Sequence, residues 1–166
     1  MNNITLFYGK RHTNPEFSNF HIAPFVIDGV EYPSSEHYFM FEKARLFDPG
    51  GEALKKMSVE LSPAQMKKLG RLVNNFDGAV WDEAGRVAMY RAVYAKFTQN
   101  PELKEKLLAT ENTIIAEASP FDRKWGIGMG VSNENAYNPD KWRGRNWLGQ
   151  VLMEVRDAIR AMENNK

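Results

Sequence analysis

The sequence predicts a single compact α+β domain that is mainly helical and carries a small N-terminal β element. Three observations predict this class: strand-like segments lie near the start of the chain, helical periodicity dominates the remainder, and no linker or internal repeat divides it. A length of 166 residues is enough for one packed core, and two full domains are not expected. We therefore treat residues 1–166 as one domain.

The first elements are expected to be strands over Ile4–Tyr8, Ala23–Ile27 and Val30–Tyr32. Asp28-Gly29 separates the last two, and an Asp-Gly pair favours a tight hairpin turn. A small β element therefore precedes the helices.

A helix is expected after Pro33-Ser34-Ser35, and Glu36 begins the stripe that its apolar positions form. The stripe continues through Phe39, Met40, Lys43 and Leu46. A second helix is predicted from Ser62-Pro63-Ala64-Gln65 to about Gly70, because a serine N-cap, a proline at the first helical position and a glutamine three residues after the cap are typical of a helix start.

We interpret the next two predicted helices as structural scaffold. Asp82 is predicted to cap a helix that runs through Lys96, and Asn100-Pro101 begins the following one. The buried face of the first is expected to contain Met89, Val93 and Phe97.

The last third of the chain contains an apolar run, a long irregular stretch and a closing helix. Thr113–Ala118 is short and apolar, whereas Ser119–Arg145 is too long and too rich in glycine for an ordinary connector, which indicates a functional or disordered loop. The closing amphipathic helix is expected to bury Leu148, Val151, Leu152, Val155, Ile159 and Met162.

Composition excludes several classes of protein. With 22 Lys+Arg against 21 Asp+Glu, the net charge of +1 gives no bulk attraction to nucleic acid or anionic membranes, so phosphate recognition has to be local. The absence of cysteine excludes disulfides, thiolate nucleophiles and cysteine-ligated metal clusters. No signal peptide or membrane span is visible, so we expect a soluble, unprocessed cytoplasmic protein with no membrane partner.

Common catalytic motifs are absent. Gly126-Ile127-Gly128-Met129-Gly130 has the wrong spacing for a dinucleotide fingerprint, and the sequence contains no GxxxxGK[ST], GxSxG or HExxH motif. His12, His21 and His37 share no metal-ligand spacing, and no serine is marked as a triad nucleophile. We expect no bound metal.

Three carboxylates stand in unusual surroundings: Glu36 on an apolar helical face, Glu117 at the end of an apolar run, and Asp122 in the irregular stretch. Glu36 and Lys43 are seven residues apart, so both can point into one cavity. The alternatives remain open: Glu36 as an acidic residue stabilised by the helix dipole, and Lys43 as a snorkelling side chain.

Tryptophans gather at the irregular stretch. Trp125, beside Gly126, is the better candidate for stacking on a planar ligand, whereas Trp142 or Trp147 is expected to cover the core. Trp81 precedes the predicted Asp82 cap and is equally explained as a hydrophobic staple. Basic residues near residue 70 are first explained as a solvated helix face, with Arg71 as an alternative phosphate clamp. These basic residues are Lys67, Lys68 and Arg71.

Taken in order, these motifs resemble the NADAR, or YbiA-like, family over nearly the whole chain. The matching segments are Glu16-Phe17-Ser18-Asn19-Phe20, Tyr32 to Phe39 with Lys43-Ala44, Lys68 to Arg71, Trp81, Met89 to Phe97, Leu107 to Thr110, Glu117 to Gly126, and Gly144 to Gly149 with Leu152 to Arg156.

The resemblance implies an N-glycosidase that breaks the bond between a ribose C1 and a nitrogen without a cofactor. It implies substrates such as phosphorylated ribosylamino-pyrimidine intermediates of riboflavin synthesis, or ADP-ribose on guanine bases, either as a nucleotide-like small molecule or in nucleic acid. The family's functional positions carry over to Glu36, Trp81, Asp122 and Trp125.

The chemistry agrees with these residue types, because breaking an N-glycosidic bond builds positive charge on the ribose, which a carboxylate stabilises. Glu36 and Asp122 are the expected catalytic pair, in exchangeable roles, and the cleft is expected between the Glu36 helix and residues 119–146. The remaining candidates are Trp81 and Trp125 for stacking, and Lys43, Arg71, Asn19 and Asn146 for hydroxyls and phosphates.

Two other classes of function remain: a non-catalytic module that binds ADP-ribose or a nucleotide, and a structural protein on a degenerate scaffold. The first does not require both carboxylates, and the second does not require a loop rich in Trp, Asp, Arg and Asn. Within the enzyme class, a nucleic-acid substrate requires an open rim, for which a local basic set is available. That set is Lys10, Arg11, Arg143 and Arg145. Residues 135–145 form a longer segment than in shorter members of the family and are expected to shape substrate choice.

Overall fold

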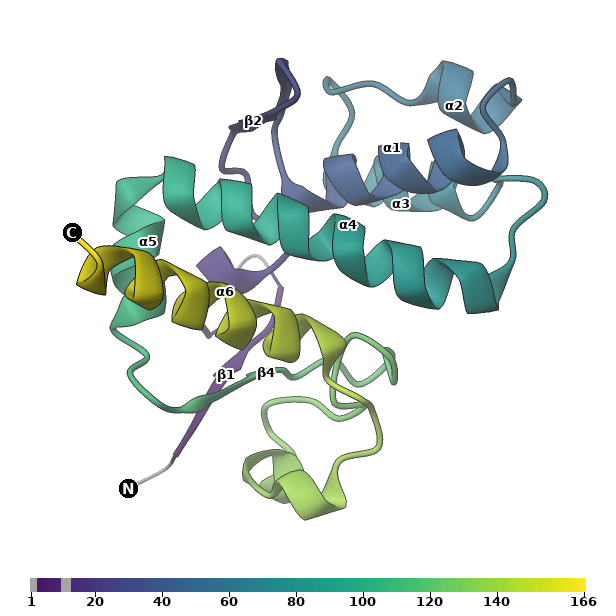
Figure 1. The fold of residues 1–166 in the computed structure, drawn as a ribbon. Coiled ribbons are helices and arrows are strands. Elements are labelled where there is room, and N and C mark those ends of the chain that lie inside the picture. Colours follow the sequence, from purple (N-terminus) through teal and green to yellow (C-terminus); the bar gives the residue numbers. More distant parts are fainter. Residues whose placement is uncertain (1–2, 10–12) are drawn as a thin grey trace. The chain divides into compact units, whose positions relative to one another are not determined.

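The computed structural model describes residues 3–9 and 13–166 (Figure 1). The chain folds into two compact units: a terminal unit of Met1–His21 with Pro101–Lys166, and a central unit of Ile22–Asn100. Helices dominate both and the strands are short, so the predicted α+β class is confirmed. Buried hydrophobic side chains are present in each unit.

The central unit begins with a β-hairpin. Its strands are β2 (Phe25–Ile27) and β3 (Val30–Tyr32), which pair antiparallel with Phe25 opposite Tyr32. Asp28 and Gly29 both have positive φ, 51° and 78°, as the predicted tight turn requires. The exposed edge of β2 is closed by the Gln99 side chain, which accepts from the Val26 N–H at 2.8 Å and donates to its carbonyl at 2.9 Å.

Four helices complete the central unit. They are α1 (Ser35–Phe47), α2 (Glu52–Lys56), α3 (Pro63–Gly70) and α4 (Gly78–Gln99). The predicted helix start at Ser62 is confirmed, because Ser62 and Gln65 form a complete capping box. α1 packs on α3 and α4, and its first two turns are buried nearly all round. Leu46, by contrast, is half-exposed, so the predicted apolar stripe ends before it.

The predicted cap of α4 at Asp82 is wrong. The helix begins at Gly78, and the Asp77 carboxylate accepts from the backbone N–H groups of Ala79 and Val80 at 3.0 and 3.2 Å. Asp77 therefore satisfies the N–H groups that a helix start leaves unpaired. Trp81 consequently lies inside the helix rather than before it, so it is not a staple. Met89, Val93 and Phe97 are buried on α4 as predicted.

The terminal unit is built on a parallel strand pair. β1 (Ile4–Phe7) pairs with β4 (Ile114–Glu117), with Ile4 opposite Ile114. The N-terminal β element is therefore not one sheet, because β1 pairs with a strand more than 100 residues later in the sequence and the hairpin forms its own two-stranded sheet. The unit also contains α5 (Pro101–Leu108) and α6 (Trp147–Asn164), which pack on each other.

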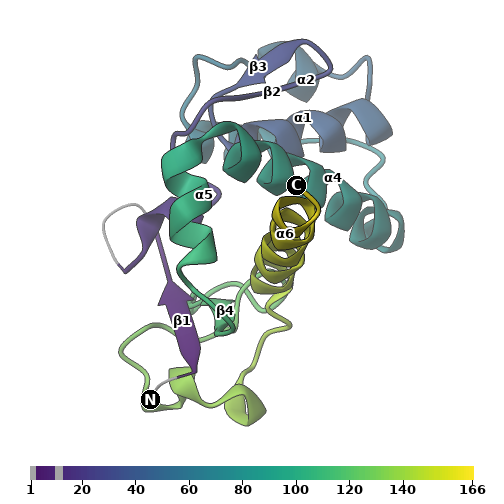
Figure 2. The same ribbon diagram turned by 60° about the vertical axis from the view of Figure 1, so that its left-hand side comes forward.

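α6 covers the strand pair and lies beside β4 in both views (Figures 1 and 2). The predicted buried face is confirmed for five of its positions, which are Leu148, Val151, Leu152, Val155 and Ile159. Met162 is half-exposed, because α6 extends beyond the strand pair that it covers.

The irregular stretch folds back on itself and is held by backbone hydrogen bonds. The Arg143 and Gly144 N–H groups donate to the Ile127 carbonyl at 2.9 and 2.8 Å, and the Arg145 N–H donates to the Arg123 carbonyl at 2.8 Å. Three short 3₁₀ segments complete the unit, at Pro15–Phe17, Glu134–Tyr137 and Pro139–Lys141. One hydrophobic cluster joins the loop to the strands: Leu6, Ala116, Ala118, Ile127, Met129 and Ala136, with Trp142 packed against it.

Within the described ranges, no helix combines the length and apolar character that a membrane crossing needs.

His37 makes stability depend on pH. It is fully buried, and its Nε2 lies 2.8 Å from the Leu61 carbonyl while its Nδ1 lies 2.7 Å from the Ser34 hydroxyl. A carbonyl only accepts, so Nε2 carries the proton and Nδ1 accepts from Ser34. Burial lowers the pKa of His37, which outweighs the opposing effect of the Leu61 hydrogen bond. The unfolded chain therefore binds this proton at a higher pH than the folded chain does.

We expect stability to be highest above the unfolded pKa of about 6.5 and to fall as pH drops below it, by up to about 1.4 kcal/mol per pH unit from this group. Urea denaturation at about pH 7.5 and about pH 5.5 measures the slope. His37→Gln should have a smaller slope, and His21→Gln is the matched control. An equal slope in His37→Gln and the unchanged protein would contradict the assignment.

Candidate functional site

The eight predicted site residues fall into two groups. Glu36, Lys43, Arg71 and Trp81 belong to the central unit, and Asn19, Asp122, Trp125 and Asn146 belong to the terminal unit. The predicted cleft between the Glu36 helix and residues 119–146 stays a prediction.

Glu36 is a buried carboxylate in the first turn of α1, with 6% of its surface exposed. At this end of a helix, unpaired N–H groups and the helix dipole stabilise negative charge. Lys43 lies two turns further along, and attraction between the two raises the pKa of Lys43, so they are within electrostatic reach. The position of Glu36 in the first turn agrees with stabilisation by the helix dipole, and its role toward a ligand stays a prediction.

Lys43 is held rather than extended into solvent. Burial lowers its pKa, the attraction of Glu36 opposes this, and repulsion from Arg71 lowers it further. The Lys43 ammonium lies 4.4 Å from the centroid of the Phe76 ring, which is a favourable cation–π position. The ammonium is therefore held against the Phe76 ring, where it feels the charge of Glu36.

Trp81 is buried in the central unit, whereas a residue that stacks on a ligand needs an exposed ring face. Its ring is 8% exposed and lies 4.9 Å from Phe39 and 6.0 Å from Phe47, measured between ring centroids. Gly85 makes room for the indole, because a Cβ there would lie 3.0 Å from the Trp81 ring. One face of Trp81 is thus covered.

Phe76 is the residue in this group that sequence reasoning missed. It is half-exposed, packs edge to face on Phe47 at 5.3 Å, and carries the Lys43 ammonium. The available signal was a large apolar ring in the polar segment Asn74-Asn75-Phe76-Asp77. A half-exposed aromatic ring beside a held cation offers a planar ligand a stacking surface.

Arg71 is exposed at the C-terminal cap of α3 and contributes positive potential at Lys43. Lys67 and Lys68 are exposed on the same helix, as a solvated face predicts. The group therefore combines one buried carboxylate, a held ammonium and an exposed guanidinium beside aromatic rings.

In the terminal unit, Asp122 is fixed by its own loop. Its Oδ1 accepts from the Lys124 N–H at 2.9 Å and from the Trp125 N–H at 2.8 Å, which forms a local turn. Among the residues that the structure describes, none donates a hydrogen bond to its Oδ2. The turn thus fixes the orientation of a half-buried carboxylate, whose role toward a ligand stays a prediction.

Trp125 and Trp147 form an edge-to-face pair with ring centroids 5.6 Å apart. Trp147 is buried, which together with the packing of Trp142 on the cluster confirms that these two rings cover the core. Trp125 is half-buried. Stacking of Trp125 on a ligand stays a prediction.

Asn146 is a positioning residue in this structure. It is 3% exposed, its Oδ1 accepts from the Glu117 N–H at 3.1 Å, and its Nδ2 donates to the Ile115 carbonyl at 2.9 Å. These bonds fasten β4 to the start of α6. Asn19 is half-buried in the turn after the first 3₁₀ segment. Substrate binding by either residue stays a prediction.

Asn146→Gly is expected to destabilise the protein by about 1–3 kcal/mol, because it leaves one buried and one partly buried backbone group of β4 without the Asn146 partner. Asn146 has a left-handed φ of 55°, which glycine tolerates, so Asn146→Ala should cost more than Asn146→Gly. Thermal and urea denaturation of both variants measure the difference. A Gly variant as stable as the unchanged protein but with a raised KM would instead assign Asn146 to substrate binding.

Over residues 3–9 and 13–166, no three or more His, Asp or Glu side chains are grouped so as to hold a metal ion. The predicted basic-rim residues Lys10 and Arg11, together with His12, lie outside the described residues.

Comparisons with known proteins match segments that contain both groups of predicted site residues. A family model described as the NADAR domain matches residues 6–160 and so spans both units. The chain is 40% identical over 128 residues to N-glycosidase R617 of Acanthamoeba polyphaga mimivirus, covering 77% of this chain and 75% of that protein. It is 32% identical over 156 residues to N-glycosidase YbiA of Escherichia coli strain K12, covering 94% of this chain and 88% of the relative.

The solved structure of that Escherichia coli protein, determined by NMR, superposes with a TM-score of 0.79 at 29% identity, covering 99% of this chain and 89% of the other. A maize chloroplastic protein named riboflavin biosynthesis protein PYRR is 30% identical over 170 residues, which cover 95% of this chain but 25% of the maize protein.

Proposed function

The chain belongs to the NADAR domain family, and from that premise we propose that it is an N-glycosidase that hydrolyses the bond between a ribose C1 and a nitrogen. Two relatives, one from a virus and one from Escherichia coli, are named N-glycosidases, and this chain aligns with most of the length of each. It is therefore a hydrolase acting on N-glycosyl compounds. The observation that carries the chemistry is the burial of Glu36, a carboxylate that is kept from bulk water and feels the charge of Lys43.

In the reaction, the oxygen of a water molecule bonds to C1 while the C1–N bond breaks. The electron pair of that bond stays with the leaving base, which gains a proton, and the water gives a proton to a carboxylate. We assign to Glu36 the stabilisation of the positive ribose and the activation of this water. Asp122 positions the ribose or assists protonation of the base, and the two roles can be exchanged.

The other predicted residues hold the substrate. We assign to Trp125 and Trp81 the stacking on the base or sugar. Lys43 and Arg71 hold phosphate, while Asn19 and Asn146 complete the set through hydroxyl contacts or through positioning. No cofactor enters this scheme, and a cytoplasmic location stays a prediction.

Two substrates fit this chemistry. A phosphorylated ribosylamino-pyrimidine intermediate of riboflavin synthesis is favoured by the similarity to the maize riboflavin protein. ADP-ribose on a guanine base of nucleic acid is favoured by a basic set on the terminal unit. In that set Arg123 and Arg143 both lie against Gly128, and Lys124 and Arg145 each lie 5.5 Å from the Trp147 ring. All four basic residues are exposed, and this local charge suits a phosphate backbone.

The test is to incubate the purified protein with ADP-ribosylated guanosine, with an ADP-ribosylated oligonucleotide and with a ribosylamino-pyrimidine phosphate. Released base and sugar are followed by mass spectrometry, with Glu36→Gln and Asp122→Asn as controls. Release from guanine assigns an ADP-ribose substrate, and turnover of the pyrimidine phosphate alone assigns a riboflavin intermediate. Binding of ADP-ribose without cleavage of any substrate would replace the enzyme with the non-catalytic module.

A further inference from the structure

Phe121 is the most exposed large hydrophobic side chain among the described residues. It is 90% exposed, and the next such side chain, Leu72, is 65% exposed. A single exposed apolar side chain is ordinary by itself, because part of every protein surface is apolar. What Phe121 can do therefore depends on how it is held and on which side chains surround it.

The loop that carries Phe121 is held at its base and beside the ring. The Ile127 N–H donates to the Glu117 carbonyl at 2.9 Å, which closes the segment between these two residues. Within that segment Ser119 is buried, and the Asp122 carboxylate holds the turn that directly follows Phe121. A ligand that binds the ring therefore does not have to order the backbone beneath it, which lowers the cost of binding.

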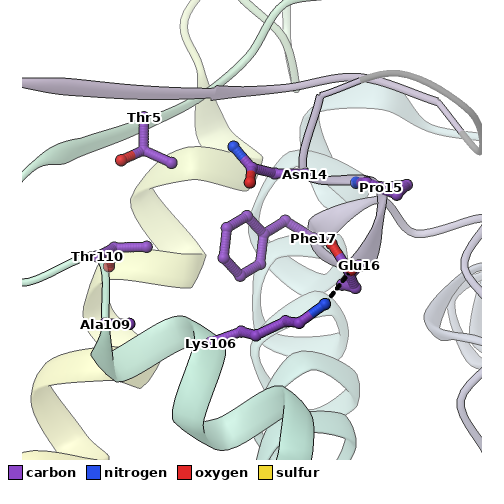
Figure 3. A pocket seen from close by; sticks show the side chains of 8 residues that line it. All are labelled: Thr5, Asn14, Pro15, Glu16, Phe17, Lys106, Ala109 and Thr110. Carbon is purple, nitrogen blue, oxygen red and sulfur yellow. Dashed lines mark hydrogen bonds and ion pairs between the residues drawn. The ribbon is translucent and has the colours of Figure 1, made fainter.

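Two lysines of α5 in the same unit are already paired with carboxylates. Lys106 pairs with Glu16 at the pocket between β1, the first 3₁₀ segment and α5, where Figure 3 draws the pair as a dashed line. Lys104 pairs with Glu163 at 3.1 Å. The charges of both lysines are therefore compensated inside the terminal unit.

Three exposed arginines near Phe121 differ from these lysines. Over residues 3–9 and 13–166, no ion pair joins Arg123, Arg143 or Arg145 to a carboxylate. The Arg145 N–H donates to the Arg123 carbonyl at 2.8 Å, and the side chains of Arg123 and Arg143 both lie against Gly128. We call these three arginines the basic cluster. Since Arg123 is two residues from Phe121, the exposed ring and the basic cluster lie in one region of the loop.

One exposed ring beside several cations distinguishes between classes of ligand. A small-molecule site is concave and encloses its ligand, whereas Phe121 projects into solvent. A membrane or a protein partner requires a wider apolar face, but Phe121 is followed by the polar residues Asp122, Arg123 and Lys124. A nucleic-acid single strand combines unstacked bases with anionic phosphates, which are the two groups that an aromatic ring and arginines bind.

We propose that Phe121 stacks on one base of a single-stranded nucleic acid and that the basic cluster pairs with the phosphates of that strand. The role of this contact in catalysis rests on the proposed function, in which Asp122, the residue after Phe121, acts at the ribose. In that role Phe121 selects a strand over a free nucleotide. Binding itself is measured on an unmodified strand and without turnover.

The probe is a fluorescein-labelled oligothymidylate of about 12 nucleotides, a length within the usual range of single-strand sites. Its fluorescence anisotropy with the full chain measures the affinity at several salt concentrations. We expect saturable binding, a slope of log K against log salt of about −2 for three phosphate contacts, and weaker binding of a duplex that contains the same strand. No saturable binding, equal affinity for the duplex, or binding of phosphatidylglycerol vesicles in place of the oligonucleotide would overturn the proposal.

Phe121→Ala should weaken binding of the oligonucleotide at least about fivefold, because one base loses its stacking surface. Phe121→Leu should weaken it as well, since leucine is apolar but has no aromatic face, and Phe121→Trp should retain the affinity. Val87→Ala is the matched control, because Val87 is an apolar side chain on α4 that is 64% exposed. Full affinity in Phe121→Ala or in Phe121→Leu would refute the stacking contact.

Arg143→Gln should weaken binding and make the salt slope shallower by about 0.7, because one phosphate contact is lost. Arg91→Gln is the matched control, since Arg91 is exposed in the central unit and pairs with Asp28 at 3.2 Å. An unchanged slope in Arg143→Gln would contradict the phosphate contact. Strand binding without cleavage of any N-glycosyl substrate would keep this site and overturn the enzyme, whereas cleavage of ADP-ribosylated guanosine without strand binding would do the reverse.

Discussion

Glu36→Gln is expected to slow hydrolysis of the N-glycosyl bond by about 10²–10⁴-fold while substrate binding persists. The amide keeps the shape and the helix position of the glutamate. It carries no charge to stabilise the positive ribose and does not take a proton from water. Single-turnover rates followed by mass spectrometry, with affinity from calorimetry, separate the two effects.

The same change is expected to alter Lys43. Burial already lowers the pKa of Lys43, and Glu36 is the neighbour that opposes this shift. Removing the Glu36 charge therefore lowers the pKa of Lys43 further, so its ammonium loses its proton at a lower pH than before. A phosphorylated substrate should consequently show a rise in KM at lower pH in Glu36→Gln than in the unchanged enzyme.

Glu42→Gln is the matched control on the same helix. Glu42 pairs with Arg45 at 2.8 Å on a partly exposed face, where ion pairs contribute little to stability. Its turnover should equal that of the unchanged enzyme. Undiminished hydrolysis by Glu36→Gln would remove this carboxylate from the mechanism and leave Asp122 as the remaining candidate.

Signals that act within a few residues were predictable from the sequence. The hairpin turn at Asp28-Gly29 and the capping box of Ser62 with Gln65 each depend on bonds or φ values inside one short segment. The burial of Glu36 followed from the apolar stripe in which it lies. Such features depend on residues that are neighbours in the sequence, so the sequence alone predicts them.

The features that the sequence did not predict depend on competition between neighbouring cap residues or on partners that are distant in the sequence. Asp77 and Asp82 are both good cap residues, and the choice of Asp77 places Trp81 inside α4 against Phe39 and Phe47. The pairing of β1 with β4 requires a strand from beyond residue 110, which no local pattern specifies.

The candidate site likewise contains local features that the sequence indicated and tertiary contacts that it did not. Residue types and the family resemblance singled out Glu36 and Asp122 as candidates, which stay predictions. The sequence did not show that the side-chain amide of Asn146 is hydrogen-bonded to two backbone groups of β4. It also did not show that Phe76 holds the Lys43 ammonium. Both facts depend on where a loop closes, which tertiary packing decides.

The contact between α6 and β4 makes Gly149 the position with the largest expected effect on stability. A Cβ at Gly149 would overlap the Ile115 carbonyl oxygen and the Asn146 amide. The carbonyl belongs to the backbone of β4 and the amide is already bonded to that strand, so neither can move alone. Gly149→Ala is therefore expected to destabilise the protein by about 3 kcal/mol or more and to lower Tm by about 6–12 °C.

This loss exceeds the gain of about 1 kcal/mol in helix propensity that alanine brings to a helical glycine position. Gly130→Ala is the matched control in the same unit, because nothing lies within 4 Å of a Cβ there and its φ is not positive. It should leave Tm unchanged or slightly raised. A Gly149→Ala protein as stable as Gly130→Ala would mean that α6 can move away from β4, and Asn146 would then not be the fixed link between them that its two hydrogen bonds indicate.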